Sequence, residues 1–184
     1  MGTSNGRFFR NGPLALLCAS WMSLAAPALA DEYQDAIAKS FPGFKILSRT
    51  EFKKEIQKTV KGNPGLITGK FNDDELVDFA AIIRDDSKQK THLGDEYYRG
   101  MFVVCHAEDK GSYACQMLGQ GAISFPHHIY LVRVVPGTVG CYDEYGKKIP
   151  RVVKRNAIGS ESSNVASVRI HQPDGTYLNC VTAD

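Results

Sequence analysis

The chain has 184 residues, of which 43% are hydrophobic and 23% charged, and its formal net charge is +2 at pH 7. These proportions are typical of a globular domain and exclude a disordered chain, a collagen and a multi-pass membrane protein. After the first thirty residues the chain holds 20 basic and 20 acidic residues, so it lacks the broad positive charge of a nucleic-acid-binding protein.

Residues 1–30 have the pattern of a secretory signal peptide. Arg7 and Arg10 precede an apolar run that ends in Ala-Leu-Ala at Ala30. We expect cleavage after Ala30, which leaves residues 31–184 as a single α+β domain. The run is too weak for a membrane anchor, so we expect a periplasmic or secreted product with no anchor after cleavage.

Two helices are predicted next. In residues 31–40 apolar residues recur at helical spacing, and a Pro-Gly pair follows shortly after. Ser48 and Glu51 then form a capping box, and apolar residues at every fourth position predict a second helix over about residues 50–61.

From residue 66 onward the sequence changes to β-branched and aromatic runs separated by turn residues. Strands are predicted at residues 66–70, 77–84, 100–107, 112–118, 128–134, 150–155, 164–171 and 176–182. The last two are joined by a strong turn sequence at residues 172–175. Two N-terminal helices followed by consecutive strands predict an α+β fold with a mainly antiparallel, meandering sheet.

Four cysteines follow the predicted leader, and an even number in an exported chain favours two disulfides. A three-residue hairpin loop at residues 109–111 sets Cys105 opposite Cys115. Cys141 then pairs with Cys180. On the chain-entropy model the two bridges contribute roughly 3 and roughly 4 kcal/mol.

The alternative for these cysteines is a metal site shared with His106, His127 or His128. Nine, twenty-five and thirty-eight residues separate successive cysteines, unlike the short spacing of zinc ligands. We therefore predict no metal site and no cofactor.

Residues 69–80 read Gly-Lys-Phe-Asn-Asp-Asp-Glu-Leu-Val-Asp-Phe-Ala and resemble the calcium loop of FG-GAP and EF-hand-like repeats. Oxygen ligands of such a loop occupy its first, third, fifth and ninth positions, which here are Lys70, Asn72, Asp74 and Asp78. Because a cation stands at the first position, the resemblance implies a degenerate loop that binds no calcium. We predict that the Lys70 ammonium lies at its centre, held by the other three side chains.

Two readings are open for the residues that follow. A helix could begin at Asn72, with acidic residues in its first turn. A strand is favoured by the calcium-loop resemblance, and it places alternate residues on the core face: Val77, Phe79, Ala81 and Ile83.

The order of motifs over residues 41–184 looks like that of small exported bacterial proteins of unassigned function. The motifs are the degenerate loop, the cysteine hairpin, Val-Val-Pro-Gly at 134–137, Lys-Arg-Asn-Ala-Ile at 154–158 and a closing Asp-Gly-x-Tyr hairpin at 174–177. This resemblance implies periplasmic residence and a mixed sheet, but no activity.

No catalytic residue is predicted, because the serine-nucleophile, metalloprotease, phosphate-loop and dinucleotide motifs do not occur. Polar residues 85–100 and 142–148 are predicted to be mobile and suited to binding. Tyr97, Tyr98 and Arg99 are of the types that anchor interfaces, although aromatic residues also begin strands.

Three functions are compatible with these features. The leading hypothesis is an exported, non-catalytic binding module, such as an inhibitor or immunity-type protein that acts on a periplasmic protein partner. The alternatives are a periplasmic hydrolase with an unrecognised carboxylate and histidine site, and an envelope-associated structural protein.

Overall fold

Antiparallel sheets dominate the computed structural model, which describes residues 25–90, 94, 96–109, 111–143, 145–162 and 166–182. Strands make up 57% and helices 13%, and one helix has seven or more residues. The helical elements are α1 (Ala25–Ser40), η1 (Arg49–Glu51) and α2 (Lys54–Thr59). The strands are β1 (Phe44–Ile46), β2 (Leu66–Gly69), β3 (Asp78–Lys90), β4 (Glu96–Glu108), β5 (Ser112–Ile123), β6 (Tyr130–Val134), β7 (Gly137–Tyr142), β8 (Lys148–Val153), β9 (Ala157–Glu161), β10 (Ala166–His171) and β11 (Tyr177–Thr182).

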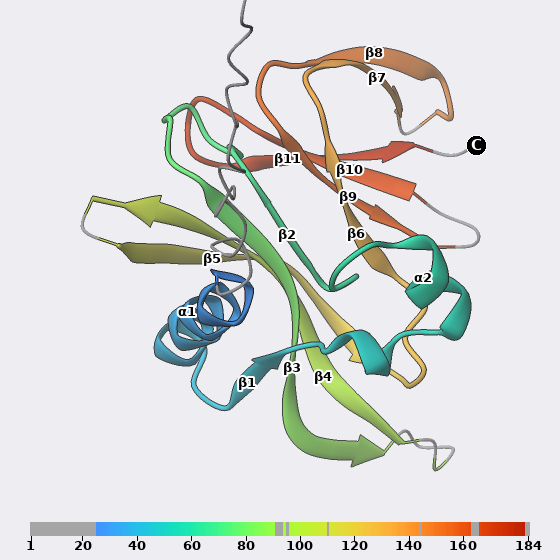
Figure 1. The fold of residues 1–184 in the computed structure, drawn as a ribbon. Helices are drawn as coiled ribbons and strands as arrows, with labels where there is room; N and C mark the ends of the chain where they lie inside the picture. Colours follow the sequence, from blue (N-terminus) through green and yellow to red (C-terminus); the bar gives the residue numbers. More distant parts are fainter. Residues whose placement is uncertain are drawn as a thin grey trace, which may run out of the picture.

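The strands form three sheets (Figure 1). The five-stranded sheet has the order β1-β3-β4-β5, with β2 also pairing with β3. The four-stranded sheet has the order β11-β10-β9-β6, and β7 and β8 form a separate two-stranded hairpin. Every pairing between these strands is antiparallel.

The five-stranded sheet is buried on both faces, because α1 covers one face and the four-stranded sheet covers the other. Phe79 of β3 packs with Tyr33 of α1. Ile82 faces the opposite way, into the cluster that includes Leu131 and Ile158. A third cluster, between the four-stranded sheet and the β7–β8 hairpin, contains Cys141, Val153, Ala157, Val168, Ile170 and Cys180.

The prediction of an α+β fold with two N-terminal helices and one meandering sheet is wrong. The first helix ends at Ser40 as predicted, but the second is replaced by η1 and the six-residue α2. Phe52, only 1% exposed, interrupts the helical path because it forms a β-bridge with His127. The Lys53 N–H donates to the His127 carbonyl at 2.9 Å, so the backbone is extended where the periodicity predicts helix.

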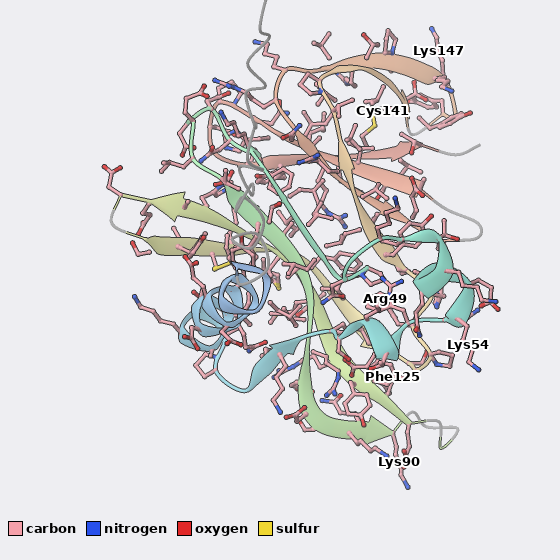
Figure 2. The ribbon with its side chains drawn as sticks, in the orientation of Figure 1. Arg49, Lys54, Lys90, Phe125, Cys141 and Lys147 are labelled. Atoms are coloured by element: carbon pink, nitrogen blue, oxygen red, sulfur yellow. A yellow bond between two sulfur atoms is a disulfide. The ribbon has the colours of Figure 1, made fainter. Side chains whose placement is uncertain are left out.

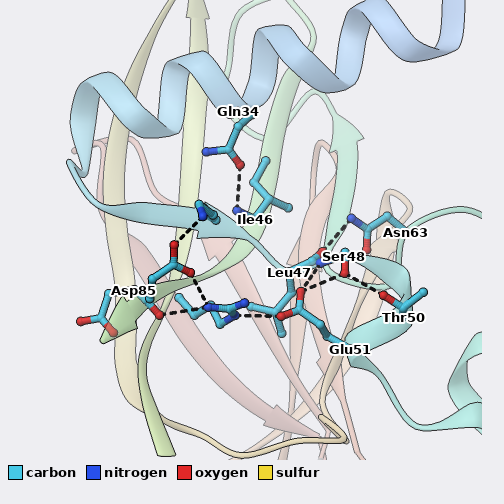
Figure 3. Close-up of polar contacts among 11 residues, drawn as sticks. Gln34, Ile46, Leu47, Ser48, Thr50, Glu51, Asn63 and Asp85 are labelled. Atoms are coloured by element: carbon cyan, nitrogen blue, oxygen red, sulfur yellow. Dashed lines mark hydrogen bonds and ion pairs between the residues drawn. The ribbon is translucent and has the colours of Figure 1, made fainter. Parts of the chain in front are cut away.

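Polar contacts fasten this segment to its neighbours (Figure 3). The Glu51 carboxylate accepts a hydrogen bond from the Ser48 N–H at 2.7 Å, as the capping box predicts, and another from Arg84 Nε of β3 at 2.8 Å. Gln34 of α1 accepts one from the Ile46 N–H at 3.0 Å. The link between α1 and β2 is therefore held by β3 and α1 together.

Most of the segment 85–100, predicted to be a mobile loop, forms the outer half of the β3–β4 hairpin. β3 continues to Lys90 and β4 begins at Glu96, with an ion pair between Lys88 and Glu96 at 2.8 Å. Residues 91–93 and 95 lie outside the described part of the chain. Cross-strand pairing thus converts a polar segment into regular sheet.

Both predicted disulfides are confirmed. Cys105 and Cys115 lie directly opposite each other on β4 and β5, and Gly111 in their hairpin loop has a left-handed φ of 74°. Cys141 of β7 is bonded to Cys180 of β11, so this bridge joins the β7–β8 hairpin to the four-stranded sheet. The two bridges indicate an oxidising, exported environment.

Removing the second bridge tests how the hairpin is held. The Cys141→Ala/Cys180→Ala variant should lose up to about 4 kcal/mol of unfolding free energy, because its cross-link spans the longer loop. The matched Cys105→Ala/Cys115→Ala variant should lose about 3 kcal/mol. Urea unfolding measures both, and limited proteolysis should cut the β7–β8 hairpin only in the first variant. A larger loss from the shorter bridge would contradict this view.

His127 makes the stability of the fold depend on pH. Burial, followed by the charge of His128, lowers its pKa to about 4 from 6.5, so the folded state keeps the ring neutral. Between these values the unfolded chain binds more protons, and stability falls as pH drops from 7 to 4. The loss from this group is up to about 3 kcal/mol.

The His127→Leu variant should flatten this acid limb in urea unfolding followed from pH 7 to pH 4. The slope is the quantity compared, because the substitution also changes packing against Phe52. His128→Leu, at the exposed neighbouring position, is the comparison: because the charge of His128 is only the second cause of the lowered His127 pKa, this variant should reduce the slope less than His127→Leu does. An unchanged slope in His127→Leu would show that other groups cause the acid sensitivity.

Candidate functional site

A cavity of about 170 Å³ opens where three connecting segments meet at one end of the sheets. It is lined by residues 71–73 before β3, by residues 152–156 at the end of β8 and in the link to β9, and by residues 170–173 at the end of β10 and in the turn to β11. This volume holds a small polar group and a few waters.

The first wall is the predicted calcium loop, and its own side chains hold the turn. The Asn72 amide donates to Asp74 Oδ2 at 2.6 Å, and Asp74 Oδ1 accepts the Leu76 N–H at 2.8 Å. Lys70 instead binds Glu75 at 2.5 Å, so the prediction of an ammonium at the loop centre is wrong. The helical alternative is also wrong, and Val77 is 53% exposed rather than in the core.

Asp78, at the ninth loop position, is fully buried and serves the fold. Its carboxylate accepts the Phe71 N–H at 2.8 Å and the Ala107 N–H at 3.0 Å. The same group lies 3.2 Å from Nδ1 of His106. One carboxylate therefore joins the cavity wall to both central strands of the five-stranded sheet.

A polar layer extends from Asp78 between the two large sheets. His106 Nε2 lies 3.4 Å from the Tyr177 hydroxyl, which donates to the Phe71 carbonyl at 3.3 Å. The His171 ring packs edge-on against Tyr177, with a centroid distance of 5.3 Å. Burial, with the charge of Asp78 adding to it, raises the pKa of Tyr177, so its phenol stays protonated and acts as a donor.

The second wall is clamped to the first. Asn156 exchanges two hydrogen bonds with the Lys70 backbone, both at 3.1 Å. Arg155 binds Glu75 at 2.8 Å, and hydrogen bonds from Lys70 and then Arg155 lower the pKa of Glu75. Lys154, in contrast, forms no ion pair among the described residues. As far as the chain is described, the Lys154 ammonium at this wall has no carboxylate partner.

Further positively charged side chains lie on the β7–β8 hairpin next to the cavity. Residues 147–155 contain five cationic side chains and no acidic one. We define the basic hairpin surface as Tyr145, Lys147, Lys148, Arg151 and Lys154, all of which are exposed. Within the described part of the chain, none of its four cations forms an ion pair, although the Lys148 ammonium lies 5.9 Å from the ring centroid of Tyr142.

The tip of this hairpin contains a hydrogen-bonded turn and presents an aromatic side chain. Asp143 Oδ1 accepts the Tyr145 N–H at 3.0 Å and the Lys147 N–H at 2.8 Å. Tyr145 is 85% exposed. Figure 2 shows Lys147 at the end of the hairpin and Lys90 at the opposite end of the molecule. The region 142–148, predicted to be mobile, is thus a hydrogen-bonded turn as far as it is described.

The three predicted interface anchors contact other parts of the same chain. Tyr98 lies between the Phe125 ring, at a centroid distance of 5.2 Å, and the Arg84 guanidinium, at 4.7 Å. Arg99 binds the buried Asp85 at 3.1 Å, and Tyr97 is half-buried. Two of the three side chains are therefore engaged within the fold, and none lies in the cavity or on the basic hairpin surface.

No family model, curated protein or solved structure matches the chain. Among the described residues, no set of three or more His, Cys, Asp or Glu side chains is arranged to hold a metal ion. In the same part of the chain, no helix has the length and apolar character needed to cross a membrane. The resemblance to calcium-loop repeats and to small exported proteins stays a prediction.

The chemistry of this arrangement suits recognition of negative charge. Lys154 and the other hairpin cations offer N–H donors to carboxylates, and Tyr145 offers apolar area with a polar end. The run of cations at residues 147–155 is present in the sequence, but it is not predicted there as a site. Only Lys154 and Arg155 enter the sequence-based prediction, as part of the motif at residues 154–158. That Arg155 is neutralised while Lys154 is free depends on the position of Glu75.

The role of Asp78 can be tested by removing its charge. The Asp78→Asn variant keeps the size of the side chain but weakens two charge-assisted hydrogen bonds, so it should lose about 2 to 3 kcal/mol of unfolding free energy. Asp73→Asn, at an exposed position of the same turn, should lose less than about 0.5 kcal/mol. Equal losses in urea unfolding would contradict a structural role for Asp78.

Proposed function

We propose that this chain is an exported binding module that docks an acidic surface of a protein partner onto the basic hairpin surface. The observation that supports this most is the set of four exposed cations on β8 and its flanks that form no ion pair within the described chain. Some exposed cations elsewhere, such as Lys88 and Arg99, bind carboxylates, and the exposed lysines around α2 share their segment with Glu51 and Glu55. An inhibitor or immunity-type protein that covers a partner's surface would use such a face.

Export is the first element of the proposal. The disulfides require an oxidising compartment, and we infer the periplasm from the predicted leader. α1 begins before the predicted cleavage point at Ala30, and residues 1–24 lie outside the described chain. Cleavage there leaves Tyr33 and Ile37, the α1 residues of the core, in the mature protein.

Rigidity is the second element. A hairpin held by a disulfide and by an Asp143-capped turn loses little conformational freedom on binding, which favours affinity. The cations attract an acidic partner over long range, whereas Tyr145 supplies the buried contact that holds the complex. The hydrolase and envelope-protein alternatives stay hypotheses that no observation at this site favours.

Charge reversal tests the proposal. The mature, disulfide-bonded protein is used as bait in periplasmic extract of its own source, and bound proteins are quantified. The wild type should retain a stoichiometric partner, whereas Lys147→Glu/Arg151→Glu should lose it and higher salt should weaken it. Tyr145→Ala should weaken binding by about thirtyfold, the equivalent of about 2 kcal/mol.

The control is Lys90→Glu, which reverses one charge at the opposite end of the molecule and is compared with the single variant Lys147→Glu (Figure 2). It should bind like the wild type. A partner retained equally by the charge-reversed hairpin and by the control would refute this assignment of the surface.

A further inference from the structure

β5 is the outer strand of the five-stranded sheet, and no described strand pairs with its free edge. It runs for twelve residues, Ser-Tyr-Ala-Cys-Gln-Met-Leu-Gly-Gln-Gly-Ala-Ile, with no charged residue and no proline. An outer strand exposes a row of unpaired backbone N–H and C=O groups, which another strand can bind.

The other outer strands carry the features that normally prevent such pairing. β1 and β2 have three and four residues. β8 contains Lys148, Pro150 and Arg151, and β6 contains Arg133. β5 has only a bulge, where its register with β4 shifts between Phe102 and Val103. β7 and β11 also lack charge and proline, but each has six residues and the Cys141–Cys180 bridge ties them together. The length of β5 therefore sets it apart from the other edges of the molecule.

The free edge is also accessible. α1 packs over the beginning of β5, where Tyr113 meets Tyr33 with a centroid distance of 6.0 Å. Further along, Met117 is 49% exposed, and Gln120, Gly121 and Ala122 are exposed as well. The second half of the strand is open to a neighbouring chain.

We infer that β5 pairs antiparallel with β5 of a second copy of this chain, joining two five-stranded sheets across a twofold axis. In such a pair each strand faces its own sequence, so a charged residue near the axis would face a like charge. β5 has no charge, whereas self-pairing of β8 would bring Lys148 and Arg151 against their own copies. Antiparallel pairing would also satisfy the free backbone groups and bring the two Met117 side chains close to the axis.

This inference is independent of the proposed partner, because it concerns a different sheet from the β7–β8 hairpin. Sedimentation equilibrium of the mature, disulfide-bonded protein, from low to several hundred micromolar, should show a monomer–dimer equilibrium. Hydrogen exchange should show amide protection in β5 that increases with protein concentration.

A lysine in the pairing strand should separate the copies. Met117→Lys should weaken dimerisation by about tenfold or more, because two ammonium groups meet near the axis. Val152→Lys, at a 67% exposed position of β8, should leave it unchanged. Near-UV circular dichroism verifies that both variants fold. If Met117→Lys does not fold, the hydrogen-exchange experiment on the wild type tests the dimer instead.

Two results would overturn the inference. One is a wild-type monomer at every concentration. The other is a dimer that gives no concentration-dependent protection in β5, which would place the contact elsewhere.

Discussion

The carboxylate of Asp78 is the interaction on which the arrangement of the sheets depends. It is fully buried at the start of β3. The hydrogen bonds that it accepts from the Phe71 and Ala107 N–H groups offset the free-energy cost of removing the carboxylate from water. His106 beside it extends the contact to Tyr177 of the other large sheet. The cavity wall, the central strands and the interface between the sheets therefore share one buried charge.

Charged side chains in this protein differ in whether they form ion pairs within the fold. Arg155 and Lys70 converge on Glu75 and fasten the cavity walls, and Arg84 and Arg99 bind carboxylates near the β3–β4 hairpin. An exposed ion pair contributes little to the free energy of unfolding. Its main effect is that the two opposite charges cancel at that part of the surface. The four cations of the basic hairpin surface form no ion pair within the described residues, although Asp143 lies at the tip of the same hairpin. The Cys141–Cys180 disulfide holds this hairpin, and with it the basic hairpin surface, against the four-stranded sheet.

Local pattern and tertiary contact disagree most clearly around Phe52. The capping box between Ser48 and Glu51 forms as predicted, since it needs only residues three positions apart. The helix beyond it does not form, because burying Phe52 beside His127 gains more than continuing a short, weakly stable helix. The outer β3–β4 hairpin shows the opposite case. There a polar segment is ordered by pairing with a neighbouring strand, which its own composition does not reveal.

The sequence by itself determined the features that depend on neighbours in the chain or on cysteine pairing. These are the end of the first helix at Ser40, both disulfides, the register of the cysteine hairpin and the turn after Gln172. Only the tertiary structure decided that the strands divide into three sheets, that His106 lies between Asp78 and Tyr177, and that Arg155 pairs with Glu75 while Lys154 has no ion-pair partner among the described residues. These contacts join residues far apart in the chain. Their energies depend on which groups lie next to each other in the folded chain. Periodicity and turn sequences report only on residues close together in the sequence, so they do not predict these pairs.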